Sequence, residues 1–145
     1  MQNPREEFPP TIWPPAPDAT TGERVALADC WWPRRFAAID ASDAEGFASF
    51  LANDVQFRFG NAPPLSGRRA VRASIAAFFK QIDSCSHRLT GIWQEPGSFV
   101  CEGEVTYTRV DLRVVTLPFV ITCVLRGEEI SSYRIYVDNG PLVAP

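Results

Sequence analysis

Residues 98–111 read SFVCEGEVTYTRVD, and this stretch decides the fold class. Two kinds of residue alternate along it, a period of two that is typical of a β-strand with one buried face. The face predicted to be buried carries Cys101, Gly103, Val105, Tyr107, Arg109 and Asp111, and the opposite face carries Glu102, Glu104, Thr106, Thr108 and Val110. The pattern predicts a long strand in a sheet with one buried side.

Three further strands are predicted around it, over residues 86–95, 117–125 and 129–137. The breaks between these strands are short, so neighbouring strands must be antiparallel. A fifth strand, over residues 55–59, precedes them and ends in a loop with two prolines. The second half of the chain is therefore predicted to form an antiparallel meander.

Helices are predicted in the first half of the chain. Over residues 21–39, apolar residues recur every three or four positions, which gives one apolar stripe on a helix. Pro33 interrupts this helix, which must either kink there or begin again. A short second helix is capped by Ser42 or Asp43, and a third covers about residues 68–82. Helices followed by a meander predict an α+β fold, with helices on one face of an antiparallel sheet.

Length and composition indicate one globular domain. The chain has 145 residues, of which 46% are hydrophobic and 21% charged, as in an ordinary protein with a core. Residues 1–20 contain six prolines and are predicted to form an N-terminal arm, which leaves residues 21–145 for the domain. The net charge of -3 argues against a nucleic-acid-binding surface.

The cellular location of the protein is predicted from the length of its apolar segments and from the composition of its N-terminal residues. The longest apolar runs, such as residues 117–125, fall short of the roughly 18 residues that cross a bilayer, so no membrane partner is predicted. Residues 1–24 carry acids and prolines where a secretory signal needs a basic start and an unbroken apolar stretch. We therefore expect a cytoplasmic protein whose four cysteines are buried thiols.

No metal or cofactor is predicted. The cysteines form no C-x-x-C pair, and His87 is the single histidine. The chain has no G-x-S-x-G motif, phosphate-binding glycine loop or dinucleotide fingerprint. His87 has no acidic cluster near it in the sequence, and we interpret it as a surface or strand-end residue.

The charged pair at the end of the central strand is the candidate for chemistry. Arg109 and Asp111 lie two residues apart on the predicted buried face, and a buried charge is costly unless it is paired. One interpretation is a structural salt bridge at the edge of the sheet. The other is an acid or base at the end of an apolar cavity, where desolvation and the arginine act on its pKa in opposite directions.

The alternation of the other strands predicts the lining of such a cavity, with helical residues added from the N-terminal stripe. An apolar cleft with a few polar groups is the usual form of a small-molecule site, but the same side chains could also fill a solid core. The predicted ligand-binding residues are Tyr133, Tyr107, Phe57, Phe59, Ile135, Phe119, Trp32 and Phe36.

The chain resembles the SnoaL-like branch of the nuclear transport factor 2-like superfamily over about residues 23–141. The stretches that carry the resemblance are FAAIDASD (36–43), FLAND (50–54), GRRAV (67–71), YTRVD (107–111) and YRIYVD (133–138). The resemblance implies a cone-shaped barrel of curved antiparallel sheet around three N-terminal helices, and a homodimer formed through the outer face of the sheet.

Within this superfamily, residues 108–111 look like the Arg-x-Asp segment of limonene-1,2-epoxide hydrolases. The resemblance implies that Asp111 is the acid and that Arg109 orients it. That family's second aspartate falls on Ile135, and its water-binding tyrosine and asparagine fall on Phe57 and Phe59. Compared with ketosteroid isomerases, the oxyanion tyrosine falls on Phe36 and the base aspartate near Phe59.

The sequence therefore predicts a domain that binds a small hydrophobic, oxygenated molecule. Asp111 would catalyse an isomerisation, cyclisation, dehydration or epoxide opening by acid/base chemistry without a cofactor. The alternative is a non-catalytic module of the same fold that binds a small ligand or serves dimerisation.

Overall fold

The fold is given by a computed structural model, which describes residues 23–24 and 33–145. The predicted N-terminal arm, Trp32, Cys30 and most of the first predicted helix lie outside the described residues. Four helices and seven strands are described: β1 (Glu23–Arg24), α1 (Pro33–Asp40), α2 (Ala44–Ala48), β2 (Leu51–Phe59), β3 (Leu65–Ser66), α3 (Arg68–Phe79), β4 (Ile82–Glu95), β5 (Ser98–Arg109), β6 (Val114–Arg126), β7 (Glu129–Tyr136) and α4 (Gly140–Val143).

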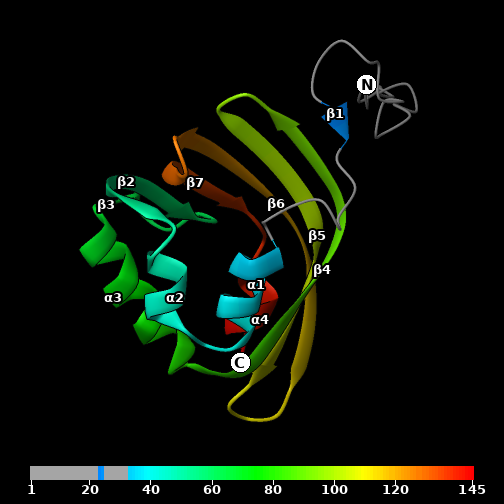
Figure 1. The fold of residues 1–145 in the computed structure, drawn as a ribbon. Helices are drawn as coiled ribbons and strands as arrows, with labels where there is room; N and C mark the ends of the chain where they lie inside the picture. The colour runs from blue at the N-terminus through cyan, green and yellow to red at the C-terminus, as the bar shows by residue number, and fades with distance from the viewer. Residues whose placement is uncertain (1–22, 25–32) are drawn as a thin grey trace, which may run out of the picture.

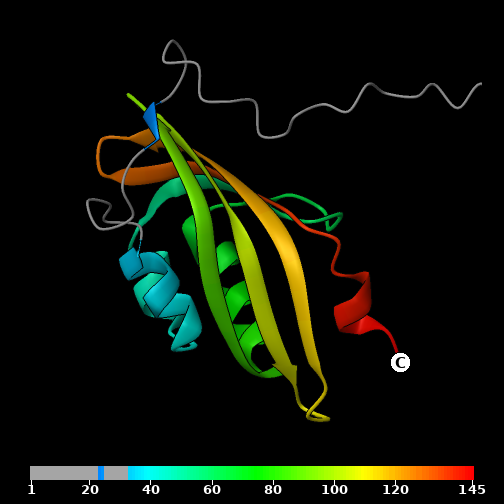
Figure 2. The ribbon, with the colours of Figure 1, turned by 90° about the vertical axis from the view of Figure 1, so that its right-hand side faces the viewer.

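The strands form one strongly curved sheet in the order β1-β4-β5-β6-β7-β2-β3. Figure 1 shows α1, α2 and α3 on its concave side, and Figure 2 shows α3 behind the long strands β4, β5 and β6. The predicted α+β fold class, with helices packed inside a curved sheet, is confirmed. None of the described helices is long and apolar enough to cross a membrane.

One pairing in the sheet is parallel. The meander β4-β5-β6-β7 is antiparallel as predicted, but β2 lies parallel to β7, with Phe57 opposite Tyr133 and Phe59 opposite Ile135. The predicted antiparallel sheet thus contains one parallel pairing that the sequence did not indicate. These two strands lie far apart in the chain, so no hairpin fixes their relative direction.

The helix boundaries follow the local signals. The described part of α1 begins at Pro33, where a missing backbone donor costs nothing because the first turn has no acceptor for it. Asp43 caps α2, since its Oδ1 accepts a hydrogen bond of 2.9 Å from the backbone N–H of Gly46. The third helix ends at Phe79 rather than near residue 82, which allows β4 to begin at Ile82.

The core lies between the concave face of the sheet and the helices. Along β5 buried residues alternate with more exposed ones from Phe99 to Tyr107, so the predicted period of two is confirmed over that span. The outer face leaves Val100, Val124 and Tyr136 exposed. That this face forms a homodimer stays a prediction.

Three of the four cysteines lie in the described part of the chain, as buried free thiols: Cys85, Cys101 and Cys123. Burial raises the pKa of Cys85 and of Cys101 from the usual 9.0 to about 12, and it also raises the pKa of Cys123. These thiols therefore stay protonated in the folded protein at pH values where an exposed thiol ionises.

We predict that the protein loses stability as the pH rises above 9. Unfolded thiols release their protons near pH 9, whereas Cys85 and Cys101 keep theirs until about pH 12, so the unfolded chain binds fewer protons in that window. Each thiol then lowers the free energy of unfolding by about 1.4 kcal/mol per pH unit. Denaturant titrations across this range measure the slope, and Cys101→Ala should reduce it. A stability independent of pH above 9 would contradict the prediction.

Gly103 permits a close approach of β4 and β5 where their register shifts. This residue lies opposite Leu89, where the register between β4 and β5 shifts. A Cβ atom on Gly103 would lie 2.2 Å from the carbonyl oxygen of Arg88, which is backbone and cannot rotate away. Glycine therefore permits the close approach of the two strands at this point.

We predict that Gly103→Ala lowers the free energy of unfolding by about 3 kcal/mol, because the strands must separate to accommodate the methyl group. Gly127→Ala is the matched control. Its Cβ would meet nothing within 4 Å, although its φ of 65° is left-handed. The control should therefore cost only about 1 kcal/mol. Denaturant titrations compare the two variants. Equal losses in the free energy of unfolding would show that the contact with the Arg88 carbonyl oxygen does not cause the destabilisation.

Candidate functional site

A cavity of about 160 Å³ lies between the concave face of the sheet and α3. Its walls are mainly aromatic and aliphatic, and two of its lining residues, Ala62 and Ser74, are exposed, so the cavity meets the surface there. The predicted ligand-binding residues that line it are Tyr133, Tyr107, Phe57, Phe59, Ile135 and Phe119. Phe36 is not among the lining residues, and Trp32 is outside the described residues.

Two phenol groups bring polarity to this apolar lining. Burial raises the pKa of Tyr107 above its usual 10.0, and the carboxylate of Asp40 raises it further. Burial likewise raises the pKa of Tyr133. Both hydroxyls therefore remain neutral at physiological pH and can donate a hydrogen bond.

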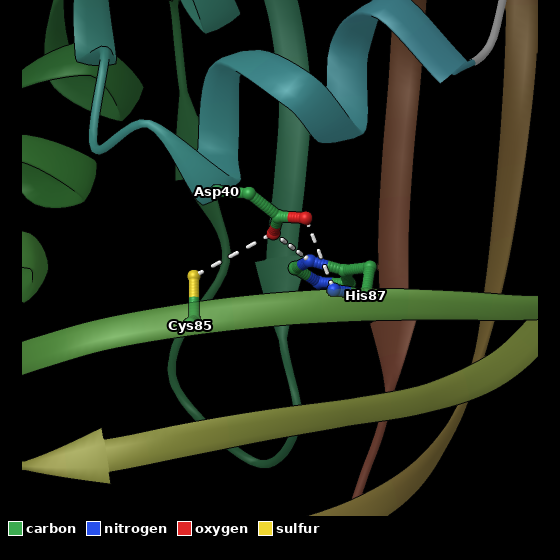
Figure 3. Close-up of side chains that lie close together, drawn as sticks. All are labelled: Asp40, Cys85 and His87. Atoms are coloured by element: carbon green, nitrogen blue, oxygen red, sulfur yellow. Dashed lines mark hydrogen bonds and ion pairs between the residues drawn. The ribbon is translucent and has the colours of Figure 1, made fainter.

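A carboxylate and an imidazole meet beside the cavity (Figure 3). The Oδ1 atom of Asp40, the last residue of α1, lies 2.6 Å from Nδ1 of His87 on β4. Its Oδ2 atom accepts a hydrogen bond of 3.1 Å from the backbone N–H of His87. Both carboxylate oxygens thus hold the same residue, which fixes the position of the imidazole ring.

The imidazole ring of His87 is enclosed, with 8% of the side chain exposed. The ring of Phe36 packs against it at a centroid distance of 5.0 Å, and Phe119 presents a T-shaped contact at 5.5 Å. Because a carboxylate can only accept, Nδ1 donates to it, and Nε2, on the opposite edge of the ring, is the nitrogen that the carboxylate does not contact. No described residue forms a hydrogen bond with Nε2, and His87 is itself part of the cavity lining.

Cys85 joins this pair from the same strand. Residues two apart on a strand point to the same face, so Cys85 and His87 both face α1. The Cys85 thiol lies 3.6 Å from the carbonyl oxygen of Ile39 and 3.8 Å from Oδ1 of Asp40. It therefore supports the carboxylate from the side away from the imidazole (Figure 3).

Asp40, Cys85 and His87 also offer three kinds of metal ligand, with all ligand atoms within 4.8 Å of one another. The arrangement fits a hydrogen-bonded pair better than a metal centre. Nδ1 and Oδ1 are already in contact at 2.6 Å, and the raised pKa of Cys85, about 12, keeps its thiol protonated. A metal ion would have to separate the first pair and displace that proton.

The interpretation of His87 as a surface or strand-end residue was wrong. It depended on a strand beginning at residue 86, whereas β4 begins at Ile82 and carries His87 into the interior. Asp40 was not identified from the sequence at all. It lies 47 residues away from His87, and only the packing of α1 on β4 brings the two together.

The structure places Arg109 and Asp111 apart from the cavity. They form the predicted ion pair, with Nη2 of Arg109 3.1 Å from Oδ2 of Asp111. However, β5 ends at Arg109, and Asp111 lies in the following turn with 40% of its side chain exposed. Asp111 also contacts Arg113 at 3.5 Å, and Arg109 donates to the carbonyl of Ala144.

Neither Arg109 nor Asp111 lines the cavity, so the expectation that both face an enclosed chamber was wrong. Alternation with a period of two would place Arg109 and Asp111 on the inner face of the sheet only if the strand continued to residue 111. Leu112, with a φ of 67°, marks the tight turn that ends it. The catalytic roles assigned to Arg109 and Asp111 stay predictions.

Arg35 is the buried charged side chain among the residues described, with 2% exposed. Its guanidinium carbon lies 4.5 Å from the centroid of the Phe50 ring, a cation–π geometry. Burial lowers its pKa to about 9. It does not line the cavity, so we assign it to packing rather than to the site.

Comparisons with known proteins agree with this architecture. Residues 33–133 match the model of the SnoaL-like domain family. An NTF2-like protein of unknown function from Burkholderia pseudomallei superposes with a TM-score of 0.70 at 18% identity, covering 77% of this chain and 91% of that one. A Xanthomonas campestris protein named "putative polyketide cyclase" gives 0.68 at 18% identity, covering 78% and 91%.

A ligand complex is also among the similar structures. A ketosteroid isomerase-like fold from Catenulispora acidiphila, in complex with trimethylamine, gives a TM-score of 0.67 at 17% identity, covering 72% of this chain and 82% of that one. No match was found among functionally curated proteins. At these identities the solved structures show the fold alone, whereas the family match spans more than half of the chain. The chain belongs to the SnoaL-like domain family and has the NTF2-like fold.

Proposed function

We propose that this domain binds a small apolar, oxygenated molecule in its cavity and that Asp40 and His87 transfer a proton to or from it. The observation that carries the proposal is the 2.6 Å contact between Oδ1 of Asp40 and Nδ1 of His87, beside an apolar cavity that His87 lines. Asp111, the residue favoured by the sequence, lies outside that cavity.

The contacts of Asp40 give His87 the properties of a general base. A carboxylate that accepts from Nδ1 selects the tautomer with Nε2 unprotonated and stabilises the imidazolium that forms when Nε2 takes a proton. The second contact, from Oδ2 to the backbone N–H of His87, prevents the carboxylate from rotating away. General acid/base catalysis of this kind contributes roughly 10²- to 10⁴-fold in rate.

Tyr107 supplies a hydrogen-bond donor that complements the proposed base, His87. Tyr107 lines the same cavity and lies close enough to Asp40 for that charge to raise its pKa. Its neutral hydroxyl can donate to an oxygen on which negative charge develops as His87 removes a proton. Isomerisation, cyclisation, dehydration and epoxide opening each involve a proton transfer to or from the substrate. The similar structure named "putative polyketide cyclase" supports cyclisation within this range.

We predict that proton exchange on a simple ketone distinguishes the Asp40–His87 pair from Asp111 as the group that transfers the proton. The probe is exchange of the α-protons of a cyclic ketone in D₂O, followed by NMR, which needs no knowledge of the natural substrate. Asp40→Asn and His87→Gln should each slow the protein-catalysed exchange about 10²-fold, because the base loses its orientation or its nitrogen. Asp111→Asn should leave the rate unchanged, since Asp111 is outside the cavity.

The matched control is Asp54→Asn, which removes a carboxylate that is paired with Arg126 on the surface. Melting temperatures of all four variants show whether each still folds. Loss of exchange in Asp111→Asn with full activity in Asp40→Asn would favour the sequence-based assignment. Ligand binding without any catalysed exchange would favour the alternative of a non-catalytic binding module.

A further inference from the structure

We infer that the ligand of this cavity is a neutral molecule built on one six-membered ring with an oxygen substituent, and that Phe78 sets this limit. The inference rests on the proposed function, because it assumes that the cavity is the binding site. It narrows the ligand class beyond the small oxygenated molecules expected from the sequence.

The volume of the cavity sets the size of the ligand. At about 160 Å³ it is smaller than the roughly 300 Å³ at which pockets for drug-sized molecules begin. An apolar cavity of about 150 Å³ in a protein core takes up one benzene molecule. One ring therefore fills this cavity, and fused rings exceed it.

Phe78 closes the cavity on the side of α3. Its ring lies 5.8 Å from the ring of Phe59 on β2 and 5.8 Å from that of Tyr107 on β5, the latter contact T-shaped. The strands β2 and β5 are separated in the sheet by β6 and β7. Because the Phe78 ring contacts residues on both strands, it spans the concave face of the sheet and prevents a longer ligand from extending along that face.

The lining also sets the charge of the ligand. No lysine, arginine, aspartate or glutamate is among the described lining residues, so a charged ligand would lose its hydration without gaining an opposite charge. Asp40 contacts His87 on the side of Nδ1, and a carboxylate there repels anions. The polar residues of the described lining are His87, Tyr107, Tyr133 and, at the opening, Ser74, and these neutral groups suit a hydroxyl or carbonyl oxygen.

The test compares phenol, 2-naphthol and benzoate as ligands of the full chain. Phenol matches the inferred class, 2-naphthol adds a second ring, and benzoate adds a charge. Dissociation constants come from NMR titrations that follow the ring signals of His87, which locate binding in the cavity. Phenol should bind at least about tenfold more tightly than 2-naphthol or benzoate, the difference that a modest packing or desolvation penalty produces.

Variants at Phe78 test its role. Phe78→Ala removes one ring from the wall, so 2-naphthol should gain at least about tenfold in affinity relative to phenol. Phe78→Leu makes a smaller opening and serves if the alanine variant does not fold. Phe99→Leu is the matched control, since Phe99 is a buried phenylalanine of β5 that does not line the cavity, and it should leave the ligand order unchanged.

The outcomes separate this inference from the proposed function. If 2-naphthol or benzoate binds wild-type protein as tightly as phenol while shifting His87, the ligand class is wrong and the cavity remains the binding site. If Phe78→Leu and Phe99→Leu change the relative affinities for phenol, 2-naphthol and benzoate equally, Phe78 does not limit the size of the ligand. If none of the three compounds shifts His87, the proposed function itself fails.

Discussion

The architecture depends on a close approach between β4 and β5 at Gly103. A side chain there would collide with the carbonyl oxygen of Arg88, so the strands can approach this closely at the register shift only because the residue has no Cβ atom. The curved sheet has a concave face that holds α1, α2 and α3 (Figure 1), and the cavity lies between this face and α3. A flat sheet of the same residues would present its inner side chains to a single layer of helix and would leave no enclosed space.

The bend also determines where polar groups can be buried. His87 lies two residues before the shifted part of β4, on the face that turns toward the end of α1. There the carboxylate of Asp40 satisfies both the ring and the backbone of His87, so an imidazole with 8% of its side chain exposed is not left without partners. A hydrogen-bonded pair of this kind fixes the position of α1 on the sheet more strictly than apolar contacts alone.

Much of the fold could be predicted from the sequence, because alternation and short connections are local signals. The period of two along β5 and the short breaks between strands identified the meander, and the helix predicted over about residues 68–82 corresponds to α3. The parallel pairing of β2 with β7 could not be predicted in this way. It joins segments far apart in the chain, and their relative direction follows only from the complete packing.

The candidate site could be predicted only in part, for a related reason. Alternation identified the aromatic lining, since that property belongs to single strands. It failed at Asp111 because alternation holds only inside a strand, and two residues past Arg109 the chain has already turned toward solvent. It failed at Asp40 because the end of a helix faces whatever packs beneath it, here a histidine 47 residues later. The aromatic lining follows from alternation within single strands, whereas the proposed Asp40–His87 pair forms only where the C-terminal end of α1 packs on β4.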